Sequence, residues 1–143
     1  MRNTGKPSQE AFEKVFETLG KRAFLHRFRD KADLFGLNKR NVKVFAQPAD
    51  YIVTNDGMHF AEVKSTADPT AFRFNLISDD QWKAAAKTIA AGGEYIFYVH
   101  RPLINQWFKI SAKEIAAVKA NGKQSIPFSL LSGNQWPLTQ GRP

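Results

Sequence analysis

The sequence predicts an α/β fold, a mixed β-sheet flanked by helices, with elements in the order α-β-ββ-α-ββ-α. Three observations indicate this fold. Asn55-Asp56-Gly57 joins two apolar runs, two serine-capped helical patterns follow it, and the aromatic run 94–100 is typical of a buried central strand. A chain of 143 residues is long enough for one core, so we expect a single domain over residues 1–143.

The first predicted element is a helix. From Ser8 to Leu19 apolar residues recur at the i, i+3, i+4, i+7 spacing of an amphipathic helix, and Gly20 ends it. The short run 23–28 is predicted to be extended. Polar and basic residues then dominate about 29–46, which we interpret as a basic loop or arm.

The middle of the chain is predicted to form a hairpin and a helix. Strands over 51–54 and 58–64 flank the Asn-Asp-Gly turn, whose residues tolerate positive φ and so favour a hairpin. After a loop, Ser78 is the expected N-cap of a helix that ends near Ala91.

The C-terminal part continues the same alternation. Strands are predicted over 94–100 and 106–110, and Ser111 is expected to cap a last helix that ends near Ala120. The C-terminal arm, about 123–143, mixes turn residues with large apolar ones. We expect it to pack on another surface, and a second subunit is one candidate.

Charge is the most informative feature of the composition. Lys and Arg number 21 against 13 Asp and Glu, and most of the surplus precedes residue 48. Clustered basic side chains gain affinity for a phosphate backbone by releasing counterions, so DNA is an expected partner. The alternative is a soluble basic protein without such a partner.

The composition also disfavours several classes of protein. No apolar stretch approaches the roughly 20 residues that span a bilayer, and the polar N-terminus lacks a signal-peptide core, so we expect no membrane partner and a cytoplasmic location. The sequence has no Cys, which excludes disulfides and thiolate metal sites. It has no Gly-rich phosphate loop, so no nucleotide cofactor is expected.

Three charged residues interrupt the apolar runs of the predicted hairpin. A turn centred on Asp56 places Asp50 opposite Glu62, about 5 Å away at Cβ, and strand alternation puts Lys64 on the same face. Two carboxylates so close repel each other unless one is protonated or a cation lies between them. A hard ion such as Mg²⁺, which prefers oxygen ligands and water, resolves the repulsion.

A metal with an amine beside it suits the hydrolysis of a phosphodiester. The ion polarises a phosphoryl oxygen and lowers the pKa of a water molecule, while Lys64 orients that water or neutralises developing charge. The alternative is structural. Glu62 and Lys64 then form an exposed, solvated pair, and Asp50 is a surface residue near the turn.

The stretch PADYIVTNDGMHFAEVKST, residues 48–66, resembles the signature of the PD-(D/E)XK nuclease superfamily, an Asp on one strand and (Asp or Glu)-x-Lys on the next. Residues 61–100 resemble the RecU-type Holliday junction resolvases, in the E-x-K-S-T run, the Phe-rich loop, the Gln of the next helix and the Gly-Gly before a hydrophobic strand, and the whole resemblance spans roughly residues 46–115. One departure is that Ala49 separates Pro48 from Asp50. The resemblance implies a restriction-endonuclease-like fold.

The resemblance also implies roles for individual residues. Lys64 corresponds to the catalytic lysine, and Mg²⁺ is the implied cofactor, with Mn²⁺ as the alternative. The implied metal ligands are Asp50, Glu62, the carbonyl of Val63 and an acid of the first helix, for which we choose Glu13 over Glu10. Gln81, the last candidate for catalysis, either reaches the site or lies on the helix surface.

DNA contacts are expected mainly from the basic run. These phosphate-contacting candidates are Arg27, Arg29, Lys31, Lys39, Arg40 and Lys43. Thr66 either touches a phosphate or ends its strand. Arg73 is a further candidate, and the Phe72 and Phe74 beside it either pack in the core or act as wedges at the centre of a junction.

The predicted function is therefore that of a Mg²⁺-dependent structure-selective endodeoxyribonuclease, a Holliday junction resolvase in a bacterial cell or a phage-infected host. Resolution requires two symmetric nicks, so we expect a homodimer with two active sites. The alternatives are another nuclease of the superfamily, of restriction or repair type, and a catalytically silent DNA-binding module.

Overall fold

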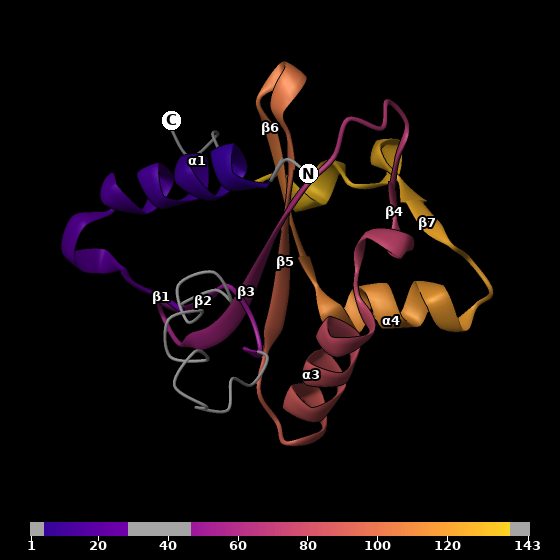
Figure 1. Cartoon of the computed structure of the whole chain (residues 1–143), viewed down its shortest axis with the longest axis horizontal. Coiled ribbons are helices and arrows are strands. Elements are labelled where there is room, and N and C mark those ends of the chain that lie inside the picture. The colour runs from indigo at the N-terminus through magenta and orange to yellow at the C-terminus, as the bar shows by residue number, and fades with distance from the viewer. Residues whose placement is uncertain (1–4, 29–46, 138–143) are drawn as a thin grey trace, which may run out of the picture.

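A computed structural model of the chain describes residues 5–28 and 47–137. They form an α/β fold in which helices lie on both sides of a mixed five-stranded sheet (Figure 1). The predicted basic arm, 29–46, lies outside the described residues, and with it five candidates for DNA contacts. These are Arg29, Lys31, Lys39, Arg40 and Lys43.

Three α-helices lie within the described ranges. They are α1 (Lys6–Glu17), α3 (Asp79–Ala90) and α4 (Ala112–Ala120). The predicted caps are confirmed, because Ser78 and Ser111 each form a capping box with the side chain three residues later. Among these helices, none combines the length and apolar character that a bilayer-spanning segment needs.

Five strands form the main sheet in the spatial order β1-β2-β3-β5-β6. They are β1 (Phe24–Arg27), β2 (Tyr51–Thr54), β3 (Met58–Ser65), β5 (Tyr95–Arg101) and β6 (Gln106–Ser111). β3 and β5 run parallel, and α3 lies in the connection between them, whereas the other neighbours are antiparallel.

The β2–β3 hairpin has the predicted register. Its turn holds Asp56 at φ 56° and Gly57 at φ 122°, which an Asn-Asp-Gly sequence accommodates. Tyr51 pairs with Ala61 and Ile52 with Phe60. The same register continued by one residue places Asp50, which immediately precedes β2, beside Glu62.

Each face of the sheet has its own apolar core. On one face, Phe12 and Phe16 of α1 pack with Tyr51, Ala61 and Val63 of the sheet. On the other face, the strands pack against α3 and α4. The main side chains of that second core are Phe97, Val99, Phe108, Ile110, Ala85 and Ile115. Residues of β3 therefore point alternately to α1 and to the α3 side.

A small second sheet was not predicted. It pairs β4 (Ala71–Arg73) with β7 (Ser125–Pro127), strands too short and too far apart in sequence to show a pattern. Phe72 and Phe74 are buried in the core, so of the two roles considered for them the packing role is confirmed. The part of the chain that the structure describes also holds five 3-10 turns, at Gly20–Arg22, Phe74–Leu76, Pro102–Ile104, Phe128–Leu130 and Ser132–Asn134.

The C-terminal arm packs on its own chain as far as it is described. Ile126, Phe128 and Leu131 join the core on the α3 and α4 side, and Trp136 crosses to the α1 side. There the Trp136 ring contacts that of Phe12 with centroids 5.5 Å apart, and the backbone N–H of Trp136 donates to the Trp107 carbonyl at 3.1 Å. These apolar residues are therefore covered within the chain itself, and contact of the arm with a second subunit stays a prediction.

This packing leads to a prediction for Trp136→Ala. Removing the indole leaves a gap between α1 and β6, so the free energy of unfolding should fall by about 2 kcal/mol, less than for a fully buried Trp. Urea unfolding measures the loss. It should be the same at low and high protein concentration, and a loss that grows on dilution would show instead that the indole packs in a dimer interface.

Candidate active site

Asp50 occupies the point where the hairpin strands separate. Its backbone carbonyl accepts the N–H of Phe28 at 2.8 Å, which continues the β1 pairing. Its side chain replaces the next rung of the β2–β3 ladder, since Oδ2 accepts the N–H of Val63 at 2.9 Å. The Asp50 carboxylate is therefore fixed against the β3 backbone and directed toward Glu62.

Glu62 and Lys64 share the face of β3 that points away from α1. Lys64 Nζ lies 3.8 Å from Glu62 Oε2, and the Glu62 carboxyl group also contacts the side chain and backbone N–H of Asp50. Glu62 is only 5% exposed. The alternative of an exposed, solvated Glu62–Lys64 pair is therefore wrong, and the three charged groups converge in a largely buried place.

Gln81 links α3 to this cluster. Its Nε2 donates to Glu62 Oε2 at 2.7 Å, while its Oε1 accepts the N–H of Ser78 at 3.0 Å. The capping box that starts α3 thus also fixes the carboxamide that holds Glu62. Of the two placements considered for Gln81, the structure shows the one at the site.

The residue of α1 that reaches Asp50 is Gln9, whose side chain hydrogen-bonds to the carboxylate. Glu13, chosen from the resemblance, lies one helical turn further on, and its carboxylate accepts the hydroxyl of Tyr51 at 2.6 Å. Tyr51 points to the α1 face, opposite to Asp50, because neighbouring residues on a strand alternate. Within the described residues no third acidic side chain joins Asp50 and Glu62 in a group that could hold a metal, so the structure corrects the placement of Glu13, and Glu10 does not take that position either.

Sequence reasoning missed Gln9 because the search was for an acidic side chain. The one available signal was helical spacing. Gln9 precedes Glu13 by four residues, so both lie on the same face of α1.

Burial makes the charged cluster electrostatically costly. It raises the pKa of Asp50, although the Val63 N–H and Gln9 oppose the shift. Burial, with the Asp50 charge beside it, raises the pKa of Glu62 to about 8. Burial also lowers the pKa of Lys64 against the attraction of both carboxylates. Bringing a divalent cation to the two carboxylates would offset this cost.

The Val63 carbonyl is directed toward the same place. Phe60 and Thr66 donate their N–H groups toward β5, to the carbonyls of Glu94 and His100. Successive residues of a strand direct their backbone groups to opposite edges, so Val63 directs both its N–H and its carbonyl toward Asp50. Two carboxylates and one carbonyl suit Mg²⁺, which keeps several water ligands.

Within residues 5–28 and 47–137, no group of three or more His, Cys, Asp and Glu side chains is arranged to hold a metal ion. The fit to Mg²⁺ therefore depends on Asp50 and Glu62 with the Val63 carbonyl. One or two carboxylates are the usual protein contribution to a Mg²⁺ site.

Arg27 is the described member of the basic run that lies near the site. It pairs with Tyr51 across β1 and β2 and acts electrostatically on Asp50. It also lines a shallow cleft together with Glu13 and Tyr51. A phosphate group approaching Asp50 and Glu62 from this side would meet a positive charge.

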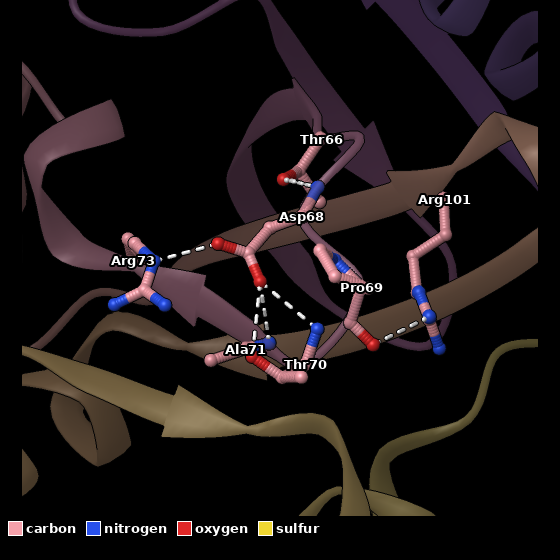
Figure 2. Close-up of polar contacts among 7 residues, drawn as sticks. All are labelled: Thr66, Asp68, Pro69, Thr70, Ala71, Arg73 and Arg101. Carbon is pink, nitrogen blue, oxygen red and sulfur yellow. Dashed lines mark hydrogen bonds and ion pairs between the residues drawn. The ribbon is translucent and has the colours of Figure 1, made fainter.

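Thr66 and Arg73 are engaged within their own loop (Figure 2). Thr66 Oγ1 accepts the N–H of Asp68 at 3.0 Å, and Asp68 Oδ2 accepts Arg73 Nε at 2.6 Å. Asp68 Oδ1 also accepts the N–H groups of Thr70 and Ala71, and these donors, with Arg73, hold the pKa of Asp68 well below its usual range. Thr66 therefore follows Ser65, the last residue of β3, and Arg73 fixes the loop that follows Lys64, whereas phosphate contacts from Thr66 and Arg73 stay a prediction.

Compared with known proteins, the chain matches no protein-family model and no curated protein. Its function is therefore inferred from the geometry of Asp50, Glu62, Lys64 and the two glutamines that contact the carboxylates.

The raised pKa of Glu62 predicts how stability depends on pH in metal-free protein. Between the ordinary value of 4.5 and about 8, the folded chain holds a proton that the unfolded chain has released. The stabilisation from Glu62 is complete below 4.5 and is lost as the pH rises through about 8. Each pH unit in this window lowers the free energy of unfolding by up to about 1.4 kcal/mol.

Glu62→Gln removes this titration, so the variant should gain stability relative to wild type as the pH rises from 6 to about 8.5. Urea unfolding of both proteins in EDTA at several pH values measures the difference. If the two stabilities change in parallel over the whole range, Glu62 does not titrate as described.

Proposed function

We propose that this chain is a Mg²⁺-dependent, structure-selective endodeoxyribonuclease that acts as a homodimer on four-way DNA junctions. The observation that carries the proposal is the convergence of Asp50, Glu62 and Lys64 in a buried cluster where β2 and β3 separate. Burying two carboxyl groups in contact with each other and with an amine costs free energy of desolvation. Phosphodiester hydrolysis accounts for all three groups, the two carboxylates as metal ligands and the amine as the catalytic cation.

The groups that would hold Mg²⁺ are the carboxylates of Asp50 and Glu62 and the carbonyl of Val63. When bound, the ion would polarise a phosphoryl oxygen and lower the pKa of a water molecule. Gln81, donating to Glu62 at 2.7 Å, keeps that carboxylate in one orientation. Fixed ligands of this kind act without reorganising during the reaction.

Lys64 has the catalytic role among the described cations. Its ammonium lies 3.8 Å from Glu62 Oε2 and is mostly buried, so it can orient a water molecule for attack or stabilise the charge that develops on the phosphoryl oxygens. Partial exclusion of water strengthens this electrostatic contribution.

Charge favours a nucleic acid as the substrate. The chain has a formal net charge of +8 at pH 7 and a sequence pI of about 9.9. Arg27 lies close enough to Asp50 to influence it electrostatically, on one side of the cluster. A polyanionic backbone brought to this side would gain affinity by counterion release without any reading of base sequence.

The choice of a four-way junction rests on the resemblance of residues 61–100 to the RecU-type resolvases. The position of Gln81 agrees with that resemblance, since it contacts Glu62. Resolution of a junction also accounts for the proposed dimer, because two paired nicks need two active sites related by a two-fold axis.

The decisive variants are Asp50→Asn and Lys64→Ala. Each should lower the rate of junction cleavage by about 100-fold or more while junction binding persists, because the changes remove chemistry and little of the binding charge. Asp56→Asn, in the hairpin turn, and Lys83→Ala, on α3, are matched controls that should cleave normally. Undiminished cleavage by both Asp50→Asn and Lys64→Ala would refute the assignment of the active site. If the wild-type protein binds junctions but does not cleave them, it is a DNA-binding module.

Substrate shape is tested with a synthetic four-way junction and a linear duplex of matched sequence, each with Mg²⁺ and with EDTA. We expect paired nicks in the junction with Mg²⁺ and little cleavage in the other three reactions. Equal cleavage of the linear duplex would favour a nuclease of restriction or repair type.

A further inference from the structure

The first turn of α1 is anchored to the sheet by a buried hydrogen bond. Ser8 is 1% exposed, and its Oγ lies 2.7 Å from His100 Nδ1. His100 Nε2 lies 3.2 Å from the side-chain oxygen of Asn105. Because an amide oxygen only accepts, Nε2 donates to Asn105 and Nδ1 accepts the hydroxyl of Ser8.

His100 is itself held firmly. Its ring stacks on Trp107 with centroids 4.1 Å apart, and its carbonyl accepts the N–H of Thr66 at 3.0 Å. On β5 it follows Val99, whose partner on β3 is Lys64. His100 therefore ties the start of α1 to the end of β3 that carries the candidate catalytic lysine.

Gln9 follows Ser8 directly and hydrogen-bonds to Asp50. The second donor to that carboxylate is the N–H of Val63, which bonds Oδ2 at 2.9 Å. A carboxylate with a single donor can still rotate about its own axis, whereas two donors from different elements fix its plane. Gln9 thereby mirrors Gln81, and each candidate carboxylate ligand contacts one helix-borne carboxamide.

We propose that Gln9 is a positioning residue of the candidate metal site, and that the hydrogen bonds from the buried Ser8 through the buried His100 to the exposed Asn105 fix the helical turn from which it acts. The carboxamide holds the Asp50 carboxylate toward Glu62, where both can bind one hard divalent cation. This inference rests on the proposed function only in taking Asp50 and Glu62 as metal ligands.

The test measures Mn²⁺ binding to DNA-free protein by titration calorimetry at pH 8, so that cleavage plays no part. Loss of a partner that orients a metal ligand typically weakens metal binding 10- to 100-fold. Gln9→Ala should therefore raise the dissociation constant about 10-fold or more. Glu10→Ala, the next residue of the same helix, is the matched control and should leave it unchanged.

Ser8→Ala tests the anchor, because it removes the hydroxyl but no group that contacts Asp50. It should weaken Mn²⁺ binding in the same direction as Gln9→Ala, under conditions where circular dichroism shows the variant folded. An unchanged Mn²⁺ affinity in folded Ser8→Ala protein would overturn the anchor.

Asp50→Asn separates this inference from the proposed function. If Asp50→Asn abolishes Mn²⁺ binding but Gln9→Ala binds as tightly as wild type, the positioning role is wrong and the metal site stands. If Asp50→Asn binds Mn²⁺ as tightly as wild type, the metal does not bind at this place, and the proposed function fails together with the inference.

Discussion

Two carboxylates, those of Asp50 and Glu62, are in hydrogen-bond contact in a place where Glu62 is only 5% exposed to solvent. Like charges in such a place cannot both be ionised without a compensating cation, and the metal-free protein meets this constraint by holding a proton on Glu62 and an ammonium group nearby. Much of the surrounding structure serves to maintain the arrangement. A purely structural cluster could have been replaced by apolar residues at little or no cost in stability.

The fold brings the cluster together from elements on both sides of the sheet. β3 supplies Glu62 and Lys64 on one face, and its separation from β2 lets Asp50 turn its side chain onto the Val63 N–H. The two helices that reach the cluster come from opposite faces, α3 with Gln81 and α1 with Gln9. Because α3 lies in the connection between the parallel strands β3 and β5, its capping box sits beside Glu62. The side chain of Gln81 therefore has two roles, because it completes the capping box of α3 and also orients Glu62.

Much of this arrangement could be predicted from local sequence patterns. The Asn-Asp-Gly turn fixed the hairpin register and hence the shared face of Asp50 and Glu62, and Ser-x-x-Gln and Ser-x-x-Glu marked the starts of α3 and α4. The β4–β7 pairing and the Trp136 contacts could not be predicted, since they join segments distant in sequence. Gln9 was missed for a related reason, because which turn of α1 meets Asp50 depends on how the helix packs. The engagement of Arg73 with Asp68 likewise depends on loop geometry that composition does not reveal.

The central claim is that Asp50 and Glu62 bind a divalent cation between them. Its most direct test is anomalous diffraction from crystals of the wild-type protein soaked in Mn²⁺ at pH 8, where the soaked ion is located without reference to activity. The account predicts an anomalous peak in contact with both carboxylates and the Val63 carbonyl, with Gln9 and Gln81 retained on their respective carboxylates. Ordered Mn²⁺ found only elsewhere, with Glu62 still paired to Lys64 and no peak beside it, would contradict the account.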